Sequence, residues 1–192
     1  MNYPLQFSFK IFAFAPQIFI RDASGANVCY VKQQLFKLKE KIQVYTSPAM
    51  TSLLAEINAD RIIDFSATYT IADANGAPFA AIRRQGLRSL WRTHYDVLEN
   101  GALAYTIREG NPWTKMADGI FGQVPIIGLL SGYLFHPRYD VFDTQSRLVS
   151  SLHKKPALME GKFELRKHLD VPNDITIVMA LFMTALLERQ RG

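Results

Sequence analysis

The feature that most constrains this 192-residue chain is an apolar run near its end, over residues 175–187. Eleven of the thirteen residues in this run are apolar, and only Thr176 and Thr184 interrupt them. Asn173 and Asp174, just before the run, are good helix-capping residues. A helix without a polar face must be enclosed on all sides. At about 1.5 Å per residue this one would span roughly 20 Å, which is too short for a bilayer core of about 30 Å.

The run therefore predicts a helix near residues 174–188 that is surrounded by protein. Arg189 and Arg191 follow it and suit the negative end of a helix dipole. The β-branched residues within Ile175–Val178 leave a strand open as the alternative.

A hairpin pattern recurs four times along the chain. Each copy has an aromatic residue, an apolar residue about two positions later, an acidic residue, a turn that usually contains glycine, and a strand that ends near Lys or Arg. An acidic side chain can bond to the turn backbone, and glycine accepts a positive φ. The four copies lie at residues 19–32, 69–83, 95–108 and 139–149, with Asp22, Asp73, Glu99 and Asp143 as their acidic residues.

The repeated hairpins predict a meandering antiparallel sheet. Further strand-like runs lie at residues 7–14, 35–45, 53–57, 62–65, 87–92 and 163–165, which brings the expected total to about a dozen. A sheet of this size usually curls or closes to remove its edges, and a barrel this wide is not filled by its own side chains. We therefore predict a mainly β fold, in which a closed antiparallel barrel of about twelve strands surrounds the hydrophobic C-terminal helix.

The hairpin pattern, Asn111-Pro112-Trp113, the stretch His136-Pro137-Arg138-Tyr139 and the final apolar helix together resemble the LURP-one-related family. This family is grouped with the scramblase-like and tubby C-terminal-like proteins. The resemblance covers nearly the whole chain and rests on order and spacing. It implies a twelve-stranded antiparallel barrel around a central helix, formed by one domain over residues 1–192.

A Gly-rich apolar segment over Met116–Phe135 is the second unusual stretch. Gly128 and Gly132 have the spacing of close-packed membrane helices, but Pro125 leaves only about ten apolar residues after it, too few to span a bilayer. We interpret the segment as an element that packs over one end of the barrel. The alternatives are an element that dips into a membrane and a transmembrane span.

Motifs of catalysis and metal binding are missing from the sequence. The four histidines, His94, His136, His153 and His168, lack metal-ligand spacing, and no nucleophile elbow, phosphate loop or EF-hand is found. The absence of an EF-hand counts against the calcium-dependent lipid scrambling of the scramblase relatives. Cys29 lies in an apolar run, which predicts a buried, inert thiol. We expect no enzyme, no cofactor and no metal.

Basic residues cluster at three places in a chain of net charge +5: in residues 37–41, in residues 83–92, and at Lys154 and Lys155 after the fourth hairpin. Such clusters are typical of a solvated outer face, in which lysine protects strand edges. They also suit an anionic headgroup, and tubby domains bind phosphoinositides through basic residues on the barrel wall. This function is transferred by analogy because no position can be matched residue by residue. The candidate headgroup-binding residues are Lys37, Lys39, Lys41, Arg83, Arg84 and Arg88.

These observations favour a non-enzymatic binding or scaffold protein that takes an anionic phospholipid headgroup or a protein partner. The alternative is a scramblase-like, membrane-active protein that inserts through residues 116–135. The modest charge and the lack of an aromatic platform among the basic residues argue against nucleic acid. The lone cysteine and the N-terminus without a signal pattern predict a cytoplasmic protein, peripheral to the membrane if it binds lipid.

Overall fold

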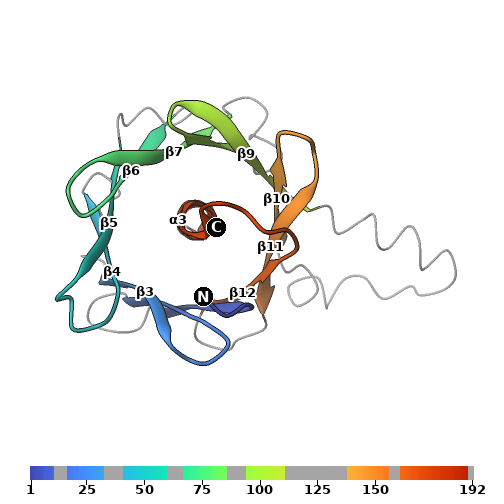
Figure 1. Ribbon diagram of the computed structural model, residues 1–192. Coiled ribbons are helices and arrows are strands. Elements are labelled where there is room, and N and C mark those ends of the chain that lie inside the picture. Colours follow the sequence, from blue (N-terminus) through green and yellow to red (C-terminus); the bar gives the residue numbers. More distant parts are fainter. Residues whose placement is uncertain are drawn as a thin grey trace, which may run out of the picture.

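A closed barrel of twelve antiparallel strands forms the wall of the protein in a computed structural model (Figure 1). The structure describes residues 1–10, 17–32, 41–59, 67–85, 94–110, 138–155 and 161–189. Every strand pairs with its neighbours in sequence, and β1 closes the ring by pairing with β12 through Leu5 and Leu165. The strands are β1 (Leu5–Lys10), β2 (Gln17–Arg21), β3 (Asn27–Lys32), β4 (Ile42–Tyr45), β5 (Leu53–Ala59), β6 (Thr68–Ala72), β7 (Pro78–Arg84), β8 (His94–Glu99), β9 (Ala102–Glu109), β10 (Arg138–Asp143), β11 (Leu148–Lys155) and β12 (Gly161–Lys167).

The apolar run forms helix α3 (Asp174–Arg189), which passes through the interior of the ring (Figure 1). Side chains from Val178 to Met183 are at most 1% exposed, because inward-facing residues of the strands surround them. The hydroxyl of Thr184 donates to the carbonyl of Ala180 at 2.9 Å, so this buried polar group costs little. The predicted barrel and its central helix are confirmed, and the strand alternative for Ile175–Val178 is wrong.

The first turn of α3 is fixed by a lysine. Lys167, at the end of β12, places its Nζ 2.9 Å from Asp170 Oδ1 and 3.0 Å from Asp174 Oδ1. The same ammonium lies 5.4 Å from the centre of the Tyr3 ring. Hydrogen bonds that Lys167 donates to Asp170 and Asp174 raise its pKa well above the usual value. Asp174 also places a negative charge at the positive end of the helix dipole.

Three hairpin turns are built in the same way. Asp22, Asp73 and Asp143 each accept, at Oδ1, the backbone N–H groups two and four residues later, at 2.9–3.1 Å. The third residue after the Asp has φ of 83° at Gly25, 82° at Gly76 and 61° at Ser146. The sequence prediction for these acidic residues is confirmed, since each one organises a turn. The remaining hairpin of the four predicted from the sequence, between β8 and β9, instead has Asn100 and Gly101 in its turn, both with positive φ.

Each of the five described hairpins also carries one extra residue in its second strand, next to the turn. In chain order, these extra residues without a partner in the strand pairing are Val28, Leu54, Phe79, Ala104 and Val149. Such a bulge reverses the alternation of inward and outward side chains beyond it.

The five turns and the segment that leads into α3 lie at one end of the barrel, because the strands alternate in direction. We call it the turn end; the opposite end holds the other termini of the strands. The predicted strands at 53–57 and 163–165 are confirmed within β5 and β12, and β4 covers only residues 42–45 of the run at 35–45. The predicted strands at 62–65 and 87–92, and the Gly-rich segment 116–135, lie outside the described residues.

Candidate functional site

Charged side chains are sorted along the barrel axis. At the end opposite the turns, each strand has two terminal residues, and some strands have a described residue directly next to these. Together these described positions hold ten cations and one anion, Glu109. We call the cations the basic rim: Lys10, Lys32, Lys41, Arg83, Arg84, Arg108, Arg138, Lys154, Lys155 and Lys162. The turn end carries six acidic residues, Asp22, Asp73, Glu99, Asp143, Asp170 and Asp174, against four basic ones. The two ends of the barrel therefore differ in the sign of their charge.

Four carboxylates lie between these ends, near the middles of their strands, and each pairs with one cation of the rim. Lys41 pairs with Glu56, and Arg83 Nη2 lies 3.3 Å from Asp96 Oδ2. Arg138 Nε lies 2.6 Å from Asp140 Oδ1, and Lys155 Nζ lies 3.1 Å from Glu164 Oε2. These pairs orient part of the rim.

Glu164 shows how strongly such a carboxylate is held. Burial opposes ionisation of Glu164, but hydrogen bonds from Arg166, Gln6 and Lys155 outweigh it and lower the pKa to about 2. Arg166 Nε lies 2.7 Å from Glu164 Oε1, and Gln6 Nε2 lies 3.2 Å from Oε2. The carboxylate therefore stays charged over the physiological range.

Three of the six headgroup residues predicted from the sequence lie in the rim, and the other three, Lys37, Lys39 and Arg88, lie outside the described residues. Lys41 directly precedes β4, whereas Arg83 and Arg84 end β7. Strands β4 and β7 are three places apart in the ring, a lateral separation of about 14 Å. Lys41 and Arg83 thus share the charged end but not one compact patch, and their headgroup role stays a prediction.

The sequence pointed to Lys154 and Lys155 but not to the rim cations that lie next to them in the sheet. Lys155 of β11 and Lys162 of β12 lie directly opposite each other in the sheet. Like charges in this position are destabilising. Lys154 lies beside them, and Lys10 ends the adjoining strand β1. Only the pairing of β11 with β12 reveals this cluster, because its members come from separate stretches of sequence.

Two histidines meet on the outer wall. The Oγ of Ser151 lies 2.8 Å from His168 Nε2 and 3.0 Å from His153 Nε2. The hydroxyl can donate its one hydrogen to only one of the two rings, and which ring accepts depends on the tautomers. No sequence pattern indicates this contact, because the partners lie 2 and 17 positions from Ser151. Ser151 is fully buried, so its oxygen is out of reach of a substrate.

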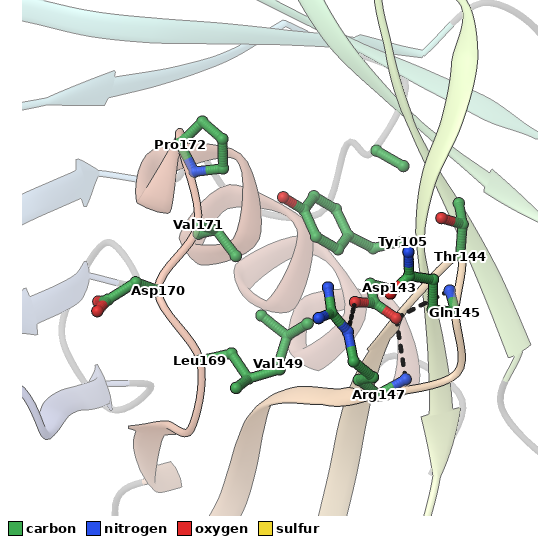
Figure 2. Close-up of a pocket in the computed structure, with 11 residues that line it drawn as sticks. Tyr105, Asp143, Thr144, Gln145, Arg147, Val149, Leu169, Asp170, Val171 and Pro172 are labelled. Atoms are coloured by element: carbon green, nitrogen blue, oxygen red, sulfur yellow. Dashed lines mark hydrogen bonds and ion pairs between the residues drawn. The ribbon is translucent and has the colours of Figure 1, made fainter.

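A pocket of about 220 Å³ opens at the turn end, between the β10–β11 turn and the segment that leads into α3 (Figure 2). Arg147 Nε contacts Asp143 Oδ2 at 2.7 Å on one side of the pocket. Tyr105 of β9 projects from the wall toward the helix. Leu169, Val171 and Pro172 line the opposite side. Ala104 and Val149, the extra residues of two hairpin bulges, also line the pocket.

Other expectations concern metals, the thiol and membrane spans. No group of His, Cys, Asp or Glu in the described ranges is arranged to hold a metal ion. The prediction that Cys29 is buried is confirmed, and burial raises the pKa of its thiol to about 12; its inertness stays a prediction. None of the helices within the described residues has the length and apolar character needed to cross a membrane.

Comparisons with known proteins bear on the fold. No protein-family model matches the sequence, and no curated protein does. The solved structures that match include an X-ray structure of a protein from Arabidopsis thaliana, with a TM-score of 0.54 and 13% sequence identity. The match covers 98% of this chain and 93% of the plant protein. At this identity the likeness concerns the fold alone: the chain shares the architecture of the plant protein over nearly its whole length, and its place in the LURP-one-related family stays a prediction.

Proposed function

We propose that this protein is a non-enzymatic binding protein that docks on anionic phospholipid surfaces through its basic rim. The observation that carries the proposal is the charge sorting along the barrel axis, with ten cations and one anion at one end of the described barrel. A negatively charged membrane attracts this end and repels the acidic turn end. The protein would therefore approach with the barrel axis steep to the membrane.

The rim retains cations that its own carboxylates do not neutralise. Lys10, Lys32 and Lys154 form no ion pair with any carboxylate in the described part of the chain. The opposition of Lys155 and Lys162 supports the same function, because a phosphate bound there would meet two cations at once, of which Lys155 also contacts Glu164. A solvated edge that only prevents strand association would not need two lysines face to face.

Co-sedimentation of the purified protein with vesicles tests the proposal. The expected result is binding to vesicles that contain phosphatidylserine, none to phosphatidylcholine alone, and loss at high salt, where the screening length shortens from about 10 Å at 0.1 M to about 3 Å at 1 M. Each basic residue near an anionic surface contributes about 1 kcal/mol. The double variant Lys32→Gln/Lys154→Gln should therefore bind roughly 30-fold more weakly.

The matched control is Arg21→Gln/Arg166→Gln, which removes the same charge from the turn end. It should bind like the wild type. Equal weakening by both double variants would show that only net charge matters and would contradict docking through the rim. A third variant, Lys41→Gln/Arg83→Gln, tests the residues that the sequence pointed to. Binding that persists in high salt would also count against a headgroup interaction.

A further inference from the structure

We propose that the turn-end pocket binds a small alkylammonium ion, with the Tyr105 hydroxyl as its hydrogen-bond acceptor. This site is separate from the basic rim, and it does not depend on lipid binding. The lining of the pocket, one hydroxyl without a protein partner and the charges around it favour such a ligand.

Tyr105 supplies a polar atom that the protein itself leaves unused. Its side chain lines the pocket, and the residue is only 7% exposed. None of the hydrogen bonds in the described part of the chain involves its hydroxyl, although Tyr45 on the outer wall bonds to Gln43 at 2.9 Å. The hydroxyl is not among the buried side-chain atoms without a partner, so it is accessible from the pocket and can bond to a molecule there.

The charges near this hydroxyl favour a cation. Asp143 is neutralised by Arg147, and Lys167 is shared between Asp170 and Asp174, which leaves an excess of one negative charge there. Glu99 adds a second, and its buried Oε1 has no hydrogen-bond partner among the described residues. Burial raises the pKa of Tyr105, and Glu99, Asp143 and Asp174 raise it further. Each of these carboxylates makes the site more negative.

The lining selects an organic cation rather than a bare metal ion. The carboxylates do not converge closely enough to hold a metal within the described ranges. Val149, Leu169, Val171 and Pro172 instead offer apolar surface to an alkyl chain. The cavity, at about 220 Å³, is smaller than the roughly 300–1,000 Å³ of drug-sized sites, so the ligand must be small.

The probe is n-butylammonium chloride, with sodium butyrate and 1-butanol as matched probes of opposite and zero charge. Titrations of the full chain followed by amide NMR should show saturable shifts around residues 143–147 and 169–172 with butylammonium. Butanol should bind more weakly and butyrate not at all. Tyr105→Phe should weaken butylammonium binding about three- to tenfold, the usual effect of one lost hydrogen bond.

Two variants keep the test decisive. Tyr45→Phe removes a tyrosine hydroxyl outside the pocket and should leave binding unchanged. Glu99→Gln keeps the shape of the side chain and should weaken butylammonium binding without changing that of butanol, so it decides the matter if Tyr105→Phe does not fold. Absence of binding, binding of butyrate as tight as that of butylammonium, or unchanged affinity in the decisive variant would overturn the proposal.

Discussion

Truncating Phe182 to alanine tests the central packing of the barrel. Phe182 lies in the middle of α3 and is completely buried. Removing a buried phenylalanine side chain costs about 3–5 kcal/mol, because both burial and the cavity left behind count against the folded state. A typical domain has only about 5–15 kcal/mol to lose. For a chain of this length the melting temperature should fall by roughly 6–20 °C.

Urea denaturation followed by far-ultraviolet circular dichroism measures this loss. The midpoint should fall while the slope stays the same, since the same surface is exposed on unfolding. The control is Leu103→Ala, at a leucine that is 45% exposed on the wall, which should cost less than about 1 kcal/mol. Equal costs at the two sites would refute a tightly enclosed helix. A soluble, cooperatively melting Phe182→Asp variant would refute it more directly, because an unpaired charge cannot be accommodated there.

Three further predictions concern the turns, the wall and the thiol. Asp73→Ala removes the acceptor of two turn hydrogen bonds and should lower the free energy of unfolding by about 1–2 kcal/mol in urea titrations; no change would show that the turn forms without it. The pKa of Glu164 is lowered to about 2 in the folded protein, so its contribution is complete above pH 4.5 and disappears as the pH falls toward 2. Glu164→Gln should therefore flatten the loss of stability over that window, and a slope like that of the wild type would contradict the assignment. Cys29 should react with a thiol reagent only after unfolding, and rapid labelling of the native protein would show that the wall opens locally.

Features written in consecutive residues were predictable from the sequence. The helix follows from an apolar run without a polar face, and the turns follow from an acidic residue a few positions before a residue with positive φ. Closure of the sheet followed from a size argument, because about twelve strands leave an interior that only another element can fill. The pairing of β1 with β12 through Leu5 and Leu165 confirms that reasoning.

Features that depend on strand register were not predictable. The opposition of Lys155 and Lys162 requires knowing which residue faces which, and a shift of one residue would separate them. The meeting of His153 and His168 at Ser151 has the same origin. Neither periodicity nor motif spacing contains this information, so the sequence pointed only to cations that are close along the chain.

The order of the elements along the chain sets an order of events during synthesis. The helix that fills the barrel is made after the whole wall, and the strand that closes the wall, β12, comes just before it. Until β12 and α3 have left the ribosome, the earlier hairpins can pair locally, but the ring has neither its closing strand nor its filling. The nascent chain must therefore wait as an open, partly apolar sheet, a state in which aggregation competes with folding. Completion depends on a contact between nearly opposite ends of the sequence, which predicts slow final folding.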